Sequence, residues 1–245
     1  MVAGCPLMAH GCYQLILIQE IMPDLSPLWL TLRIACFATL IAFGFAVAFA
    51  WIIARFSFWG RDLLDAILTL PLVMPPTVLG YYLIVVWGRN GWLGSWLHEH
   101  LGITLMFTWQ GAVLAATVVA FPLLFKSARA AFEGVNTEYE KAARILGDNE
   151  LQVFCRITLP LAARGLVAGT MLAFARAMGD FGATLMVAGN IEGKTQTVAM
   201  AVFDAVQVGD YRLANTLVVI MSVICVTILV MTNKLGAKRQ GGTRQ

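Results

Sequence analysis

Charge is scarce in this sequence: Asp, Glu, Lys and Arg make up 13% of its 245 residues, whereas hydrophobic residues make up 59%. A soluble domain carries about 25% charged residues. The polar residues are too few to cover a chain of this size in water, so lipid must surround much of it. The formal net charge of +3 gives no indication of a nucleic-acid partner.

Cysteine pairs and metal-ligand clusters are also missing from the sequence. The five cysteines are scattered without a CxxC pair, which argues against a disulfide framework and against a zinc site. His98 and His100 flank Glu99 and so do not share a helix face, and no third ligand accompanies them. The sequence therefore predicts no metal site.

Long apolar segments are what the sequence does contain. A helix needs about 20 apolar residues to cross a bilayer. The sequence thus predicts an all-α integral membrane protein with five transmembrane helices, at Ile34–Ile53, Ala66–Trp87, Ile103–Phe125, Leu166–Ala188 and Leu213–Thr232. Val198–Val208 is too short to span, contains Asp204, and is expected to be a short helix at the surface.

The positive charges predict the orientation in a bacterial-type cytoplasmic membrane. If the long connection 126–164 is cytoplasmic, most of the 17 Lys and Arg residues lie inside, and only Arg89, Lys194 and Arg212 lie outside. We therefore expect an extracytoplasmic segment at 1–27 and a cytoplasmic tail at 236–245. No Lys or Arg precedes Arg33, so a signal peptide is not expected, and both Met1 and Met22 stay open as the start.

Three prolines interrupt the second apolar segment. With Pro71, Pro75 and Pro76 within six residues, this segment cannot form one regular helix. Broken helices in membranes are tolerated where neighbours or a wet cavity satisfy the backbone. Two interpretations stay open: a broken helix beside a translocation path, and a packed kink without ligand contact.

The fourth apolar segment contains two charges, Arg176 and Asp180. Their spacing of four predicts that they share one helix face, directed toward protein or water. In one interpretation Arg176 lies along a path and donates to an oxyanion, while Asp180 partly neutralises it. In the other, the two residues form an ion pair with a structural role only.

The cytoplasmic connection contains helix start and stop signals. Thr137 and Glu140 fit a capping box that predicts a helix from Glu138, and Gly147 marks its end. A second short helix is expected at 150–157, ending before Pro160. A connector that only joins two spans can be much shorter, so this structured segment is expected to dock a partner.

The same segment resembles the EAA loop of ABC importer permeases. The resemblance rests on Ala142-Ala143, Gly147 and Ile157-x-Leu159-Pro160; at the family's glutamate position, six before the glycine, stands Lys141, with Glu140 one residue earlier. It implies a type I ABC importer transmembrane domain at 28–235, with a coupling loop at about 133–160. The residues implied to couple to the ATPase are Glu140, Lys141, Ala142, Ala143, Gly147, Ile157 and Pro160.

Four other stretches resemble the molybdate permease branch of these importers: Leu70–Tyr82, Trp87–Gly94, Trp109–Pro122 and Ala173–Thr184. Sulfate permeases share the last of them and the EAA-like segment. The resemblance implies a molybdate permease, with sulfate or tungstate as the alternative substrate. It also implies a lipid-embedded homodimer, two ATPase subunits that bind ATP and Mg, and an extracytoplasmic oxyanion-binding protein, with no cofactor and no catalytic residue on this chain.

Two other classes of function were considered. An ATP-independent carrier, or a membrane enzyme using Arg176 and Asp180, gives no reason for the capped cytoplasmic segment. Residues 188–195 loosely fit a P-loop, but a P-loop follows a buried strand and opens a helix, whereas this segment follows an apolar span. It is therefore interpreted as an outer connecting loop.

Overall fold

A computed structural model describes residues 26–237. The expectations for the start at Met1 or Met22, for nearly all of segment 1–27 and for most of the tail 236–245 lie outside the described residues. Every regular element within the described part is helical. The predicted all-α class is therefore confirmed.

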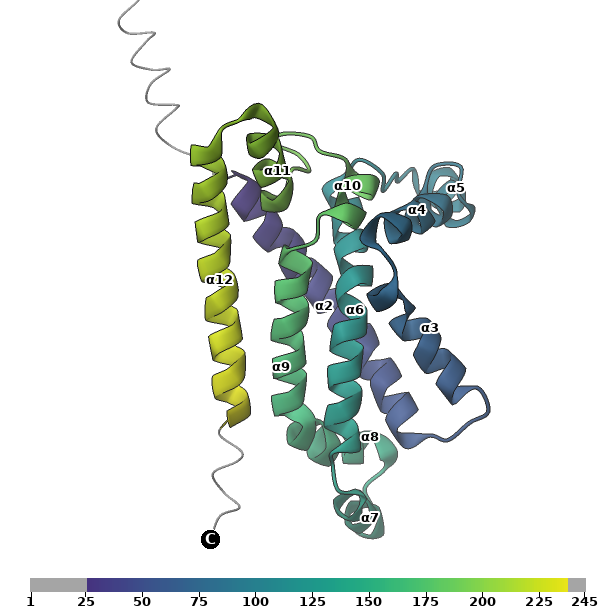
Figure 1. The fold of residues 1–245 in the computed structure, drawn as a ribbon. Helices are drawn as coiled ribbons and strands as arrows, with labels where there is room; N and C mark the ends of the chain where they lie inside the picture. Colours follow the sequence, from purple (N-terminus) through teal and green to yellow (C-terminus); the bar gives the residue numbers. More distant parts are fainter. Residues whose placement is uncertain (1–25, 238–245) are drawn as a thin grey trace, which may run out of the picture.

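Four helical runs are long and apolar enough to span a membrane (Figure 1): α2 (Ser26–Arg55), α6 (Trp109–Glu133), the run Glu150–Met178, and α12 (Tyr211–Ala237). The run Glu150–Met178 consists of α8 (Glu150–Val153), the π-helical turn η1 (Phe154–Thr158) and α9 (Leu159–Met178). The helices α3 (Arg61–Val73) and α4 (Pro76–Trp87) are together long and apolar enough for a fifth span, but their axes differ by 115°, so the pair forms either a broken span or a re-entrant loop.

Small residues let α2 pack closely on its neighbours. Five alanines that recur every three or four residues along α2 are fully buried, and they face fully buried alanines of α6; the α2 set is Ala35, Ala38, Ala42, Ala46 and Ala50. Association of helices in lipid depends on such close approach, because there is no hydrophobic driving force between apolar helices there. The core of the bundle is therefore this alanine seam with α9 packed beside it.

The short helices divide between the two ends of the bundle. Figure 1 shows α7 (Thr137–Ile145) at one end, and α5 (Trp92–Leu101), α10 (Gly182–Ala188) and α11 (Val198–Val208) toward the other. The predicted short helix Val198–Val208 has the bounds of α11. Ionic contacts join α3 to α6 in the half that contains α7: Asp65 accepts from Lys126 and from Arg129, both at 2.6 Å.

The helices extend beyond most of the predicted spans, and two predicted spans are displaced along the chain. The third begins at Trp109 rather than Ile103, because Thr108 caps the helix by accepting a hydrogen bond from the Gly111 N–H at 3.2 Å. The fourth is shifted toward the N-terminus: its helix ends at Met178, and residues up to Ala188 form the separate helix α10. Hydropathy alone did not detect this break, because the residues on both sides of it are apolar.

Candidate functional site: a helical loop and two broken spans

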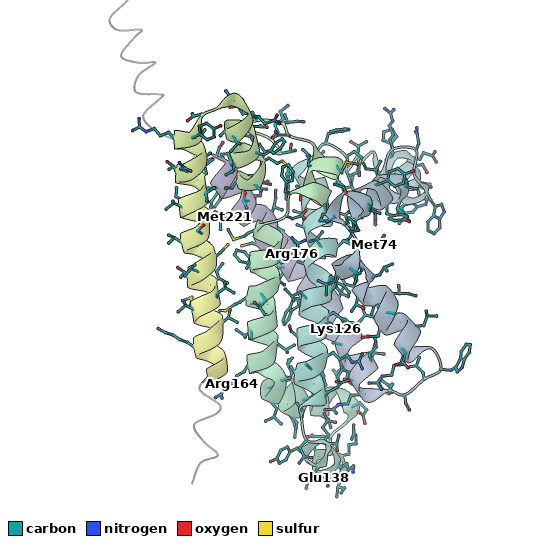
Figure 2. All side chains as sticks on the ribbon, viewed as in Figure 1. Met74, Lys126, Glu138, Arg164, Arg176 and Met221 are labelled. Atoms are coloured by element: carbon teal, nitrogen blue, oxygen red, sulfur yellow. The ribbon has the colours of Figure 1, made fainter. Side chains whose placement is uncertain are left out.

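Helix α7 projects from the end of the bundle (Figure 2, where Glu138 is labelled at its tip). The predicted capping box is wrong: the cap is Asn136, whose Oδ1 accepts from the Glu138 N–H at 2.9 Å, and Thr137 is the first helical residue. The side chain of Glu140 does not return to the start of the helix, because it is held by residues from other elements.

Glu140 anchors α7 to the bundle. It is 3% exposed, and its Oε1 accepts from Arg55 Nη2 at 2.5 Å and from Thr158 Oγ1 at 2.6 Å. Arg55 is the last residue of α2, and Thr158 ends the π turn before α9. One carboxylate thus joins three elements, and a buried, charge-assisted contact of this kind resists separation.

The turn after α7 depends on Gly147, which has φ +98°. The Gly147 N–H donates to the Arg144 carbonyl and the Asp148 N–H to the Ala143 carbonyl, both at 3.1 Å, which is the Schellman arrangement. Across the turn, Arg144 donates to both carboxylate oxygens of Glu150, at 2.6 and 3.0 Å. This hydrogen bonding raises the pKa of Arg144 above its ordinary value. The turn between α7 and α8 is therefore fixed both by its backbone hydrogen bonds and by the ion pair that spans it.

The outward face of the loop is apolar and has no partner in the described chain. Four large apolar side chains are exposed there, from 57% for Tyr139 to 87% for Leu146; they are Tyr139, Ile145, Leu146 and Leu151. Ala142 is exposed beside them, whereas Ala143 is buried. Lys141 is also on the surface, where it pairs with Glu138 at 3.0 Å. Exposed apolar patches of this kind mark contact surfaces.

The loop continues into α9 without a break. The predicted end of a second helix before Pro160 is wrong, because the π turn Phe154–Thr158 connects α8 to α9 and Pro160 lies in the first turn of α9. In the π turn the Leu159 N–H donates to the Phe154 carbonyl, five residues back. This wider turn accommodates a proline that has no N–H to donate. Pro160 is exposed and Ile157 is partly buried.

The prolines of the second span produce the bend between α3 and α4. Pro71 lies inside α3, Pro75 precedes α4 and Pro76 is its first residue. Met74, which precedes Pro75, is extended at φ −72° and ψ 141°, as a residue before proline prefers. Of the three prolines, Pro75 and Pro76 are exposed.

Arg176 and Asp180 lie on either side of the second break. The expectation that they share one helix face is wrong, because α9 ends at Met178 before Asp180 is reached. They still approach each other, with Arg176 Nη1 3.8 Å from Asp180 Oδ1. Asp180 is 2% exposed, and its Oδ2 accepts from the N–H and the hydroxyl of Thr184, at 3.0 and 2.6 Å. Its Oδ1 has no hydrogen-bond partner, and Arg176 is partly exposed.

The two breaks pack against each other. A Cβ placed on Gly182 at the start of α10 would lie 2.9 Å from Pro76 Cβ, and one on Gly80 would lie 2.6 Å from Met186 Cβ. In Figure 2, Met74 and Arg176 are at similar levels near the middle of the bundle. Pro76 is thus brought against Gly182, two residues after Asp180, whereas Pro71 stays within α3.

Several residues of these sites were not identified from the sequence. Arg55 and Thr158 hold Glu140 but lie 85 and 18 residues away from it, so no local pattern connects them. The apolar face of α7 could have been found, because Tyr139, Ala142 and Leu146 are spaced by three and four residues. Thr184, four residues after Asp180, fits the spacing of a local side-chain contact.

Solved structures with this arrangement are transmembrane subunits of ABC importers. The inward-facing methionine transporter MetNI superposes with a TM-score of 0.67 at 16% identity, covering 89% of this chain and 96% of that one. A bacterial importer of the acidic polysaccharide alginate gives 0.66 at 15% identity, covering 93% and 83%. These similarities establish the fold, which is that of a type I ABC importer permease.

Residues 46–237 match the family described as "binding-protein-dependent transport system inner membrane component", and the chain belongs to this family. The molybdenum transport system permease ModB of Escherichia coli K12 is 42% identical over 210 residues, covering 85% of this chain and 92% of that protein. The sulfate transport permease CysT of the same organism is 34% identical, covering 85% and 75%. The chain is thus a multi-pass inner-membrane component of an ABC importer, the part that does not itself carry out catalysis.

Proposed function

We propose that this chain is the permease of a molybdate importer. The supporting observation is the similarity to molybdenum permeases, at 42% identity in Escherichia coli and 40% in Bacillus subtilis, against 34% for the sulfate permease. Two copies would form the membrane pore, two separate ATPase subunits would bind ATP and Mg, and an extracytoplasmic oxyanion-binding protein would deliver the anion. A solved alginate importer is in complex with a periplasmic protein, which supports the last of these partners.

The end that contains α7 is proposed to be cytoplasmic, with the N-terminus outside and the C-terminus inside. Arg55, Arg61, Lys126 and Arg129 gather toward this end of the helices, which agrees with the positive-inside rule. The transmembrane domain is proposed to cover 28–235 and the coupling loop about 133–160.

The loop is proposed to act as a rigid lever on the ATPase. Its apolar outward face, formed by Tyr139, Ile145 and Leu146, would sit in a cleft of the ATPase, while Glu140 fixes the opposite face to the bundle. Gly147 supplies the turn, and Lys141, Ala142, Ala143, Ile157 and Pro160 complete the proposed coupling segment. Movement of the ATPase would then rotate the permease as a body, which is an established type of switch.

The translocation path is proposed to pass the two breaks. Arg176 is partly exposed and only loosely paired with Asp180, so its guanidinium keeps donors available for an oxyanion. Pro71, Pro75 and Pro76 would shape the wall of the path at the bend. If Arg176 instead has only a structural role, its removal will affect assembly as strongly as uptake.

Uptake of labelled molybdate and labelled sulfate by vesicles that contain permease, ATPase and binding protein tests the proposal. ATP-dependent molybdate uptake, suppressed by excess unlabelled molybdate more strongly than by sulfate, is the expected result. Sulfate uptake without molybdate uptake would change the substrate to sulfate. Uptake that does not require ATP or the ATPase chain would refute the importer itself.

A further inference from the structure

The pocket at the outer end of α6 is not part of the candidate coupling or translocation residues. It has a volume of about 490 Å³ and is lined by the first turns of α2 and α6 and by the loop that follows α10. Pockets that bind small molecules have volumes in this range. The lining includes two cations, Arg33 and Lys194, and no carboxylate among the described residues.

Arg33 is held in a conformation that leaves its hydrogen-bond donors available. Its guanidinium carbon lies 4.1 Å from the centroid of the Trp109 ring. A guanidinium stacked on an aromatic ring uses its face for that contact, so the N–H groups in its plane stay free. No ion pair of Arg33 with the described residues is formed.

Lys194 is positioned by a tightly closed loop. The carbonyl of Ile191 accepts from the N–H groups of Lys194, Thr195 and Gln196, at 3.0, 2.9 and 3.1 Å. The Thr195 hydroxyl accepts from the Ile191 N–H at 3.0 Å and donates to the Gly189 carbonyl. These backbone N–H groups therefore have acceptors within the loop. The group of the loop that remains for a ligand is the side chain of Lys194, which lines the pocket.

The start of α6 adds a third source of positive potential. Its cap, Thr108, satisfies the N–H of Gly111, but the N–H groups of Trp109 and Gln110 have no acceptor in the described chain. The free N–H groups and the dipole of a 25-residue helix favour an anion at this position. Asp204, which meets the lining through Gln196, also accepts from Asn190, and Glu192 of the same loop is exposed and does not line the pocket.

We propose that this pocket binds a small tetrahedral oxyanion at the outer face of the permease. Arg33 and Lys194 supply the charge, and the N–H groups of Trp109 and Gln110 supply directed donors. The inference rests on the proposed function for the identity of the anion and for the orientation that places the pocket at the outer face. It adds a binding step at the outer face, before the anion reaches the breaks near Arg176.

Equilibrium binding of radiolabelled molybdate tests the proposal, with the full-length permease and its ATPase in lipid nanodiscs, without nucleotide and without the binding protein. Unlabelled sulfate and an equal ionic strength of chloride serve as competitors. Competition by sulfate and little competition by chloride are expected, because chloride only screens the charges. A carboxylate of the binding protein is also an anion that the two cations would attract. The binding protein is therefore omitted, so that the only anion measured is molybdate.

Substitutions assign the binding to the pocket. Arg33→Gln and Lys194→Gln are each expected to weaken molybdate binding about tenfold, the loss of one charge-assisted hydrogen bond. Arg33→Lys keeps the charge and should retain more binding than Arg33→Gln. Arg89→Gln and Arg212→Gln, which remove outer cations that do not line the pocket, are the matched controls and should bind like wild type.

Absence of binding by the wild-type complex, or wild-type binding by Lys194→Gln, would overturn the proposal. Lys194 lies on an exposed loop, so this variant is informative even if Arg33→Gln fails to fold. Uptake assays with the wild-type transporter distinguish failure of the proposed pocket from failure of the proposed function. Molybdate uptake without binding at this pocket rejects only the pocket, whereas binding without ATP-driven uptake rejects only the proposed function.

Discussion

At the residue scale, two carboxylates are buried among residues 26–237, and their surroundings differ. The two residues that donate hydrogen bonds to Glu140, Arg55 and Thr158, belong to other elements. Asp180 accepts its hydrogen bonds from Thr184, only four residues along the chain. The sequence pointed to both acids, but it could not supply the partner of Glu140, because Arg55 is 85 residues away. For Asp180 the sequence predicted the nearby Arg176 correctly, but it predicted a continuous helix between them, whereas α9 ends at Met178.

Glu140→Gln is expected to loosen the loop from the bundle. The change leaves Arg55, with a side chain only 14% exposed, without its counter-charge, and breaking a buried pair in this way costs about 3–5 kcal/mol. We expect a lower unfolding temperature in detergent and weaker recovery of the ATPase on affinity purification. Glu138→Gln removes only an exposed pair with Lys141 and should behave like wild type.

Arg176→Ala is expected to lower molybdate uptake by about ten- to a hundredfold while the ATPase is recovered at the wild-type level. The reason is the loss of a charge-assisted donor for the anion, worth about 1.5–3 kcal/mol. Uptake in vesicles and recovery of the ATPase are measured on the same preparation. Equal losses in both would assign Arg176 to the structure rather than to the path.

At the element scale, the all-helical class and the presence of the long apolar spans could be predicted, because apolar length is a strong signal. Of the two breaks, only the one between α3 and α4 was predictable from the sequence. Prolines predicted the break at Met74, but no proline lies just before the break at Gly179, where Gly182 of the next helix packs closely against Pro76. Pro160, in contrast, lies inside a helical run, because a π turn accommodates it.

Gly147→Asp is expected to uncouple ATP hydrolysis from transport. A side chain at φ +98° costs about 1 kcal/mol and disturbs the turn that ends α7. Uptake should fall while ATP hydrolysis by the assembled transporter continues. Gly209→Asp carries similar strain, at φ +85°, after α11 and away from the loop. That variant should transport normally, and normal transport by Gly147→Asp at wild-type protein levels would contradict the coupling assignment.

Gly80→Ala is expected to destabilise the permease by separating α4 from α10. Its new Cβ would lie 2.6 Å from Met186 Cβ, and overpacking of this kind costs about 1–3 kcal/mol. Gly44→Ala is the control, since no atom lies within 4 Å of a Cβ there. The unfolding temperature in detergent should fall for the first variant only. Equal unfolding temperatures would mean that the contact between the two breaks is not maintained.

At the scale of the whole molecule, the orientation can be tested with single cysteines. The described cysteines, Cys36, Cys155 and Cys225, are free, and all five cysteines of the chain, Cys5 and Cys12 included, are replaced first. Leu146→Cys, on the loop, should react with an impermeant maleimide only after the cells are permeabilised. Glu192→Cys, on the opposite end, should react in intact cells. Labelling of Leu146→Cys in intact cells would show that the loop is outside, and an ATPase contact at α7 would then have no basis.

The unbroken run from Glu150 to Met178 has a consequence for control of the transporter. At 1.5 Å per residue, its 29 residues make a rod about 40 Å long, with the docking loop at one end and Arg176 near the other. The π turn Phe154–Thr158 joins the loop to α9 without a break in the helix, so displacement of one end is transmitted to the other. Under the proposed coupling, a small molecule bound beside α7 would therefore hold the residues near Arg176 in place without contacting them.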